Sequence, residues 1–380
     1  MRSGDFERVA DRRGTASVKW DRYGGRDVLP LWVADMDFAA PPAVLDALSR
    51  RVAHGIFGYT HASAALTEAV LAHVARRHGW KIEAEWLVWL PGAVAAIHAA
   101  CRLVEAGAPV VSCPPIYPPF LAAPANMGRR RLEVPLAADE DGRAVLDLDG
   151  LARAFAQGPG LFLFCNPHNP TGRVFDATEL AALAERLLAQ DMLVVSDELH
   201  ADLVLEPGLR HRPLAAVSPA LAERTITLFA PSKTFNLAGL GIGYAVIPGT
   251  ELRRRFRAAI DGILPYVNAL AYAAAEAAYT ECGDWLAALL AYLRDNRDHV
   301  TGVLAGIAGI AARPPEGTYL YWLDLRGTGI DNPVAHLERH GVGLSDGADF
   351  GAPGFARLNF GCPRATLEAA CSRLTDAFVP

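Results

Sequence analysis

The chain has 380 residues, of which 52% are hydrophobic, and a formal net charge of −6. This length can bury a substantial core and suggests two to three domains, and the negative charge argues against nucleic acid as the main partner. No run is long enough to span a bilayer, and the charged start at residues 1–8 lacks the apolar core of a signal peptide. We therefore expect a cytoplasmic protein.

Helical and strand-like patterns alternate along the chain, with no internal repeat. The first helix is predicted from Pro42, since proline is favoured in a first turn, to about His54. Further helical patterns cover residues 62–78, 93–105, 176–190, 249–260, 268–308 and 364–378. Strand-like runs cover residues 86–90, 109–113, 160–165, 192–196, 225–230, 243–247, 318–325 and 356–360. This alternation predicts an α/β protein with a mostly parallel sheet covered on both faces.

Charged and metal-binding residue types give no strong signal of their own. The clusters Arg129–Arg131 and Arg253–Arg255 are short and are interpreted as solvated faces or helix flanks. The six cysteines show no Cys-x-x-Cys spacing, and the histidines, among them His73 and His78, have no carboxylate at metal-site spacing. We expect reduced thiols and no bound metal.

Lys233 is the most informative residue, because it lies in the apolar and small-residue run Ala230–Leu240. Desolvation lowers the pKa of a lysine amine and makes it a nucleophile of the kind that forms Schiff bases. On the local run alone, a lysine that extends from a strand end to solvent is an equal alternative.

Polar residues follow two apolar runs upstream of this lysine. Asn169 lies in an Asn/Pro loop after the strand-like run that ends at Cys165, and Asp197 ends the run that begins at Met192. Open α/β sheets place ligand chemistry at the carboxyl ends of their strands. A simple loop and a helix cap by Asp197 are the alternatives.

Together, these three segments resemble the fold-type I pyridoxal 5′-phosphate (PLP) enzymes of the aspartate aminotransferase superfamily. The resemblance implies a PLP-dependent transferase-like fold with a seven-stranded, mostly parallel sheet and a smaller α/β domain. It implies a large PLP-binding domain at residues 41–283 and a small domain made of residues 1–40 and 284–380. It also implies a homodimer that acts on small amino acids.

The resemblance assigns a role to each matching residue. Lys233 would bind PLP as a Schiff base and carry the substrate Cα proton, and Asp197 would face the pyridine nitrogen. Asn169 and His200 would contact the ring 3′-oxygen, and Tyr117 would stack on the ring. The phosphate would meet Ser232 and the helix N-terminus at Gly92, Ala93 and Val94.

Three further residues receive roles in the same way. Tyr59 would reach the phosphate of the neighbouring subunit's site and is included among the catalytic residues; a buried core tyrosine is the alternative. Arg357 would grip the substrate carboxylate through two parallel hydrogen bonds. Asn359 alternates with Arg357 on the same strand, so we expect it on the same face. Asp35 is expected beside the substrate side chain, and core packing or a turn cap is an equal alternative.

Three signatures resemble the cystathionine β-lyase-like carbon–sulfur (C–S) lyases of this superfamily. They are Val18–Asp21, Leu31–Phe38 and the histidine in Asn166–Pro170. The resemblance implies β-elimination from cystathionine or cysteine S-conjugates to a thiol, pyruvate and ammonia. Transamination by a class I/II aminotransferase is the alternative. One departure is Gly241, where many aminotransferases have an arginine that neutralises the cofactor phosphate.

A nicotinamide-dependent enzyme and a non-catalytic regulatory protein are the other two classes that the sequence allows. The glycines between Gly239 and Gly243 lack the Gly-x-Gly-x-x-Gly spacing of a dinucleotide loop and precede a strand-like run. A non-catalytic, ligand-binding regulatory protein of the same fold would not need Lys233, Asp197, Asn169 and Arg357 together. Catalysis is therefore the favoured hypothesis.

Overall fold

The structure, a computed structural model, describes residues 6–378. The first five residues of the charged start and residues 379–380 lie outside it. Of the helices within residues 6–378, none combines the length and apolar character that crossing a bilayer requires.

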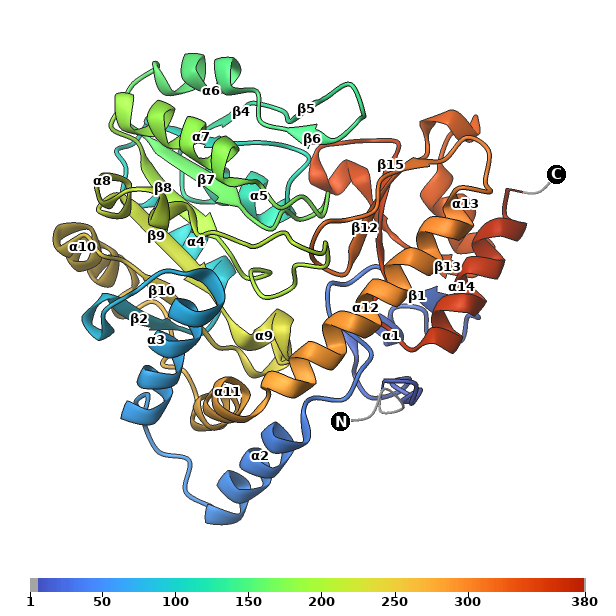
Figure 1. Cartoon of the computed structure of the whole chain (residues 1–380), viewed down its shortest axis with the longest axis horizontal. Helices are drawn as coiled ribbons and strands as arrows, with labels where there is room; N and C mark the ends of the chain where they lie inside the picture. The colour runs from blue at the N-terminus through green and yellow to red at the C-terminus, as the bar shows by residue number, and fades with distance from the viewer. Residues whose placement is uncertain (1–5, 379–380) are drawn as a thin grey trace.

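A seven-stranded sheet forms the larger part of the molecule (Figure 1). Its strands, in spatial order, are β2 (Leu87–Leu90), β10 (Gly243–Val246), β9 (Thr225–Phe229), β8 (Leu193–Asp197), β7 (Leu161–Cys165), β3 (Pro109–Ser112) and β4 (Arg130–Glu133). The strands from β9 to β4 are parallel, and β10 is antiparallel to both of its neighbours. This sheet confirms the predicted fold class.

Helices cover both faces of this sheet because its strands are apolar on both faces. Along β7, Leu161 and Leu163 pack into one apolar cluster while Phe162 and Phe164 pack into another, as the alternation of side chains in a strand requires. The first cluster includes residues of α4 (Ala93–Cys101), α5 (Pro118–Asn126) and α10 (Thr250–Ile260). The second includes residues of α6 (Leu148–Phe155), α7 (Ala177–Ala189) and α8 (Pro219–Ala222).

The two arginine clusters were only partly understood from the sequence. Arg130 and Arg131 are exposed, but they belong to the edge strand β4, which the sequence did not predict because it lacks an apolar pattern. Charged residues suit an edge strand, since they discourage pairing with other chains. Arg253 lies in α10, and its guanidinium is buried and donates to the carbonyls of Ile247 and Pro248. The interpretation as a solvated face was therefore wrong for Arg253.

A second, antiparallel sheet lies beside the first. Its order is β11 (Ala311–Ala312), β12 (Leu320–Asp324), β15 (Phe355–Asn359) and β14 (Ser345–Asp346), and α13 (Pro333–Arg339) and α14 (Arg364–Asp376) lie in the same region. The N-terminal strand β1 (Leu29–Pro30) joins this region by pairing in parallel with β13 (Val342–Gly343). A separate hairpin consists of β5 (Ala137–Ala138) and β6 (Ala144–Val145).

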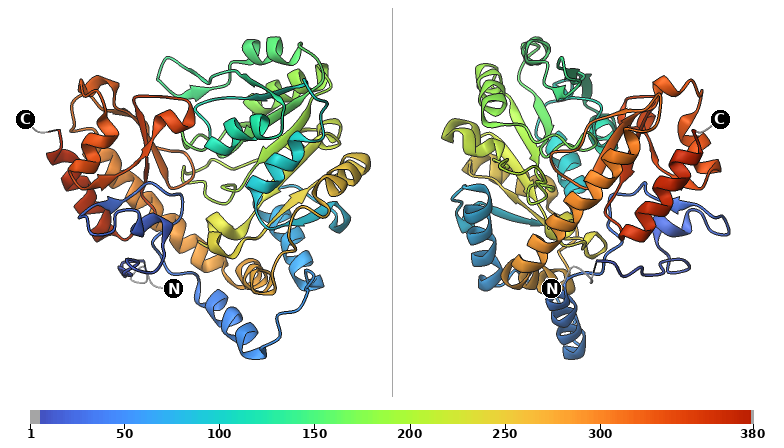
Figure 2. Two further views of the ribbon diagram at one scale, coloured as in Figure 1. Left: turned by 180° about the vertical axis from the view of Figure 1, so that it is seen from behind. Right: turned by 45° about the vertical axis from the view of Figure 1, so that its right-hand side comes forward.

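Long helices connect the two regions. The 22-residue α12 (Gly283–Leu304) runs from beside α11 (Ala269–Glu281) to the second sheet, as Figure 1 and both views of Figure 2 show. The N-terminal helix α2 (Pro42–His54) packs on α11 and projects from the rest of the molecule, and α3 (Ala64–His78) also packs on α11. The predicted helices at residues 42–54, 62–78 and 268–308 are confirmed, the last as two helices.

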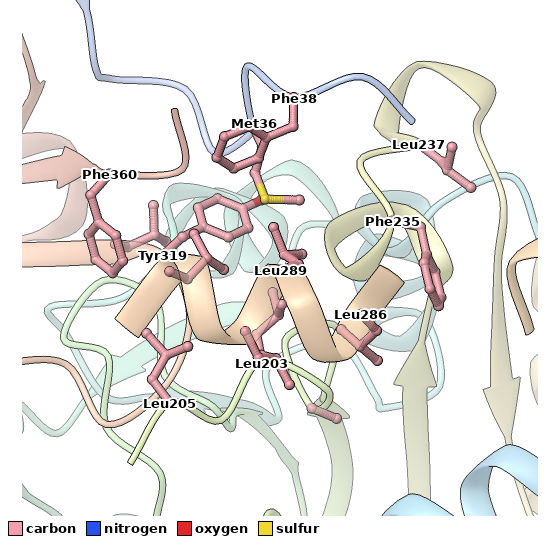
Figure 3. Close-up of a cluster of buried hydrophobic side chains, with 14 of the residues drawn as sticks. Met36, Phe38, Leu203, Leu205, Phe235, Leu237, Leu286, Leu289, Tyr319 and Phe360 are labelled. Atoms are coloured by element: carbon pink, nitrogen blue, oxygen red, sulfur yellow. The ribbon is translucent and has the colours of Figure 1, made fainter. Parts of the chain in front are cut away.

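The N-terminal segment helps to join the regions through a buried cluster (Figure 3). Met36 and Phe38 pack in this cluster with Phe235, Leu289 and Tyr319. The β1–β13 pair supports the division that we propose, with a large domain at residues 41–283 and a small domain made of residues 1–40 and 284–380, and the buried cluster joins these two domains.

Candidate active site

A cavity of about 590 Å³ lies at the carboxyl ends of the parallel strands, and both sheets contribute to its wall. This volume is within the range of ~300–1,000 Å³ that small-molecule sites usually have. All of the predicted site residues line the cavity except Tyr59, Asp35 and Asn359; those in the wall are Gly92, Ala93, Val94, Tyr117, Asn169, Asp197, His200, Ser232, Lys233 and Arg357. The fold thus brings together residues that are up to 265 positions apart, from Gly92 to Arg357.

Lys233 lies in α9 (Pro231–Thr234), the short helix that follows β9. Its Nζ donates to the carbonyl of Ala34, 2.7 Å away. Desolvation and then the positive charge of Arg357 lower the pKa of Lys233 to about 8, against the opposing effect of Asp35 and Asp197. A larger fraction of this amine is therefore uncharged near neutral pH than for an ordinary lysine, as nucleophilic and proton-transfer chemistry requires.

Asp197 ends β8 and is buried. Burial raises its pKa to about 6, although the backbone N–H of Leu199 donates to its Oδ1 at 3.1 Å and Lys233 contributes positive charge. The alternative of a helix cap is wrong, because residues 199–202 form a turn and not a helix; the Leu199 contact belongs to that turn, and the carboxyl lines the cavity. A cationic ring nitrogen beside this carboxyl would favour its ionised form.

Arg357 is buried on β15 and reaches across to both the N-terminal segment and the Asn169 loop. One of its terminal nitrogens donates to Asn169 Oδ1 (2.8 Å), and the other donates to the carbonyl of Trp32 (2.7 Å) and lies 3.3 Å from Ser345 Oγ. Its Nε has no hydrogen-bond partner among the described residues. A buried donor without a partner is costly, so this atom favours an anionic ligand in the cavity.

The residues expected around a ring lie close to one another. The backbone N–H of Tyr117 donates to the carbonyl of Asn169 at 3.1 Å, and Asn169 Oδ1 is taken by Arg357, which leaves its Nδ2 as the donor for a ligand. The Nδ1 of His200 is buried without a partner within residues 6–378. Burial, Lys233 and Arg357 hold the pKa of His200 well below its usual range, so the imidazole is neutral at pH 7.

The start of α4 provides a site for an anion. No side chain caps this helix at Gly92, and Gly92, Ala93 and Val94 all line the cavity. Free backbone N–H groups and the helix dipole favour a phosphate there. Gly241 is also in the wall with φ +64°, and a Cβ there would lie 3.1 Å from the carbonyl of Pro91. The missing arginine at this position therefore fits the local backbone.

Asp35 and Asn359 were expected to contact substrate, and the structure assigns their side chains other contacts. The Asp35 carboxylate pairs with Arg12 at 2.7 Å and lies 3.6 Å from Lys19 Nζ. Asn359 Nδ2 donates to the carbonyls of Val33 and Asp35. Strand alternation placed Asn359 on the same face as Arg357, and the N-terminal segment covers that face. Arg357 and Asn359 therefore both donate to backbone carbonyls of this segment, at residues 32, 33 and 35.

Tyr59 lies at the surface, outside the cavity wall. Its side chain is 95% exposed and contacts the ring of Tyr266, whose centroid is 5.8 Å away. The alternative of a buried core tyrosine is therefore wrong. The expected role of Tyr59 in a neighbouring subunit stays a prediction.

Sequence reasoning missed several parts of the wall and one buried cluster. Trp32, Val33, Ser345 and Phe350 line the cavity, and only the first two lie in a segment that the sequence marked as a signature. Elsewhere, His73 Nε2 lies 2.8 Å and His78 Nε2 3.4 Å from Asp202 Oδ1, so a carboxylate remote in sequence does meet these histidines. Arg77 and Thr234 also contact Asp202, which therefore has hydrogen-bond and charge partners without a metal.

Comparisons with known proteins agree with this geometry. The family model described as "Aminotransferase class I and II" matches residues 26–374. The chain is 39% identical to cystathionine beta-lyase PatB of Bacillus subtilis, covering 98% of this chain and 99% of that protein. The crystal structure of OvoB superposes with a TM-score of 0.96 at 47% identity, covering 98% of both chains. Cystalysin from Treponema denticola, which contains PLP, gives a TM-score of 0.93 at 32% identity and covers 98% of both chains.

The chain therefore belongs to the class I and II aminotransferase family of fold-type I PLP-dependent enzymes, and within it to the subgroup of C–S lyases. The residues in the cavity fit this cofactor. Lys233, with its lowered pKa, would hold its aldehyde carbon, the buried carboxyl of Asp197 would lie beside its ring nitrogen, and the uncapped N-terminus of α4 would hold its phosphate.

Proposed function

We propose that this protein is a PLP-dependent C–S lyase that eliminates the thiol from cystathionine or other cysteine S-conjugates and forms pyruvate and ammonia. The observation that carries the proposal is the presence of Lys233, Asp197 and Arg357 in one cavity, with the pKa of Lys233 lowered to about 8. The likeness to PatB and other proteins named cystathionine beta-lyase supports the C–S bond as the bond that breaks.

Each residue of the site performs a separate task in this proposal. Arg357 holds the substrate α-carboxylate, for which its planar guanidinium and unpartnered Nε are suited. Lys233 Nζ takes the proton from Cα and can deliver it to the leaving sulfur. PLP, when bound, supplies the electron sink for the electron pair of the broken Cα–H bond. Asp197 favours a protonated ring nitrogen, and Tyr117 and Asn169 position the ring.

We propose that the working form is a homodimer in which Tyr59 contributes to the partner's site. The exposed large apolar side chains include Val52, Ile56, Phe57, Tyr59, Val94, Ile263 and Tyr266, and the rings of Tyr59 and Tyr266 are in contact. Val94 also lines the cavity, so this exposed surface adjoins the site. Contiguous exposed apolar surface is typical of protein interfaces. The cytoplasmic location stays a prediction.

The decisive experiment incubates PLP-loaded protein with L-cystathionine and no added keto acid. The proposal predicts continuous release of pyruvate and free thiol while the cofactor stays in its pyridoxal form. An aminotransferase would instead convert the cofactor to its pyridoxamine form and resume only when a 2-oxo acid is added. That second outcome would refute the lyase function.

A further inference from the structure

Tyr319 is a buried polar residue to which the proposed reaction gives no role. It directly precedes β12 and is 1% exposed, and its ring lies with Met36 and Phe360 in the buried cluster of Figure 3. Its hydroxyl donates to the carbonyl of Ala34 at 2.9 Å. The same carbonyl oxygen accepts from Lys233 Nζ at 2.7 Å. Tyr319 is therefore connected to the reactive lysine through one shared oxygen atom.

The shared carbonyl is fixed by its neighbours. Asn359 Nδ2 donates to the carbonyls of Val33 and Asp35, so the peptide groups before and after the shared carbonyl are both held. Tyr319 is held by the sheet, because its own carbonyl accepts from the backbone N–H of Phe360 at 3.0 Å. A carbonyl oxygen has two lone pairs, so its two donors use its full capacity. The oxygen therefore stays directed at both donors.

The proposed reaction sets two requirements for the Lys233 amine. It must point at the substrate Cα, and it must be uncharged when it takes the proton. A carbonyl that accepts one Nζ–H orients the amine and leaves its lone pair free. However, an acceptor also stabilises the ammonium form, which would keep the amine protonated. A second donor draws on the electron density of the same oxygen and places another partly positive hydrogen beside it, so the carbonyl retains the ammonium less strongly.

We propose that Tyr319 is a positioning residue for Lys233. Its hydroxyl fixes the Ala34 carbonyl as the acceptor of one Nζ–H and limits how strongly this carbonyl retains a proton on the amine. Burial raises the pKa of Tyr319 above its ordinary value, so the hydroxyl remains a donor at the pH at which an amine titrates. The inference rests on the proposed function only for its effect on turnover, since the hydrogen bonds belong to the protein itself.

Four charged or titratable side chains face the Lys233 amine or the Tyr319 ring; they are Arg357, Asp35, Asp197 and His200. After desolvation, Arg357 on β15 is the main cause that lowers the pKa of Lys233, and the two carboxylates oppose it. His200 stays neutral and contacts the Tyr319 ring, with 5.7 Å between the ring centroids. Replacing Tyr319 by phenylalanine removes none of these groups. A change in the pKa of Lys233 in that variant therefore reports the lost hydroxyl.

The first test measures the pKa of Lys233 in the cofactor-free protein. The chain has three lysines, Lys19, Lys81 and Lys233, of which Lys81 is exposed and serves as the internal reference. Formaldehyde with cyanoborohydride methylates only uncharged amines. The rate at each lysine, followed by peptide mass spectrometry over a series of pH values, therefore gives its titration midpoint. In Tyr319→Phe the midpoint of Lys233 should rise by roughly half a pKa unit, while that of Lys81 stays unchanged.

Tyr321→Phe is the matched control. Tyr321 lies in β12, is also 1% exposed, and its hydroxyl is 3.2 Å from Thr301 Oγ1 on α12. Both variants lose one buried hydroxyl bond, so both should lower the denaturant concentration at the unfolding midpoint to a similar extent. Only Tyr319→Phe should move the midpoint of Lys233 methylation.

The second test measures turnover by the holoenzyme. In Tyr319→Phe the kcat for pyruvate release from L-cystathionine should fall roughly threefold at pH 7, because half a pKa unit corresponds to a threefold smaller fraction of uncharged amine. The difference should narrow at pH values above the pKa of the amine, and KM should change by less than about twofold. Tyr321→Phe should follow the unmodified enzyme at every pH.

Each outcome decides for or against this role. A rise of the Lys233 midpoint that is confined to Tyr319→Phe supports it. An unchanged or lower midpoint in Tyr319→Phe, or an equal rise in Tyr321→Phe, would overturn it, and a fall in kcat without a change of midpoint would reduce Tyr319 to a structural residue. If no protein releases pyruvate from L-cystathionine, the proposed lyase function fails, and the methylation midpoints still decide the role of Tyr319.

Discussion

Lys19 is buried and Lys233 is half-buried in the cavity wall, and the two amines also differ in their partners. Lys19 is 1% exposed, and its Nζ lies 2.7 Å from Asp37 Oδ2 and 3.2 Å from the carbonyl of Asp35. Lys233 donates to a single carbonyl, that of Ala34. Asp37 is further satisfied by Arg12 and by the indole of Trp20. Lys19 is thus part of an ion-pair network, whereas Lys233 has no carboxylate within salt-bridge distance among residues 6–378.

This difference separates a structural charge from a reactive one. A buried ammonium with a carboxylate partner is held in its charged form and does not act as a nucleophile. Desolvation without such a partner lowers the pKa of Lys233 to about 8 and makes its amine available. The two segments meet, since Ala34 and Asp35 connect the acceptor of Lys233 to the network of Lys19.

The largest expected effect comes from removing the reactive amine. Lys233→Ala should lower turnover of L-cystathionine by ~10³-fold or more, because the covalent link to the cofactor and the proton carrier are lost together. Borohydride reduction followed by mass measurement should attach the cofactor to the unmodified chain and not to the variant. Full turnover by the variant would remove Lys233 from the site.

Removing the structural lysine should act on stability instead. Lys19→Met leaves Asp37 buried without one of its partners, and breaking such a pair costs roughly 3–5 kcal/mol of the free energy of unfolding. Denaturant unfolding of the cofactor-free protein measures this. Lys233→Met is the matched control, and it should stabilise the cofactor-free protein, because an ammonium in a desolvating cavity opposes folding. Equal destabilisation by both substitutions would contradict the comparison.

The sequence predicted both lysine segments but could not tell their roles apart. The run around Lys233 predicted a Schiff-base lysine only together with the two upstream segments, and Val18–Asp21 was useful only as a subgroup signature. The partner of Lys19 comes from residues 35–37, and no local pattern shows which carboxylate meets which lysine. The same limit explains Asp35, whose carboxylate pairs with Arg12, and Asn359, whose amide donates to the carbonyls of Val33 and Asp35.

The fold was more predictable than the details of the cavity wall. The buried strand β7 is a continuous apolar run, β8 begins with three apolar residues, and β9 consists of β-branched and apolar residues, so all three could be predicted from the sequence. Strand β4 was not predicted from the sequence, because its exposed arginines carry no such apolar pattern. Ser345 and Phe350 were not predicted as cavity residues, because they reach the cavity only through the pairing of β14 with β15 and the turn after β14.

The carboxyl of Asp197, which lines the same cavity as Lys233, gives a pH-dependent test of how strongly this cavity desolvates charged groups. Burial raises the pKa of Asp197 from 3.8 to about 6, so the folded protein keeps a proton that the unfolded chain releases between these values. The stability that this group contributes is present below about pH 4 and is lost as the pH rises through about 6; two pKa units correspond to about 3 kcal/mol. Unfolding of the cofactor-free protein should therefore show a stability loss over this range that Asp197→Asn lacks. Parallel pH curves for the two proteins would show that Asp197 is ionised throughout.

The smallest expected effect is on kcat/KM, from substitutions of Arg357 that change its contact with the substrate carboxylate. Its two terminal nitrogens already have protein acceptors, so a substrate carboxylate gains mainly the contact with the free Nε and the positive charge. Arg357→Lys keeps the charge and loses the fork, and should lower kcat/KM by roughly 10-fold; Arg357→Ala should lower it by roughly 100-fold. Both losses should fall mainly on KM, because the contact is made to the carboxylate and not to the bond that breaks. Steady-state kinetics with L-cystathionine measures kcat and KM separately for each variant. A loss confined to kcat would instead assign Arg357 to the positioning of Asn169, whose amide oxygen it holds at 2.8 Å.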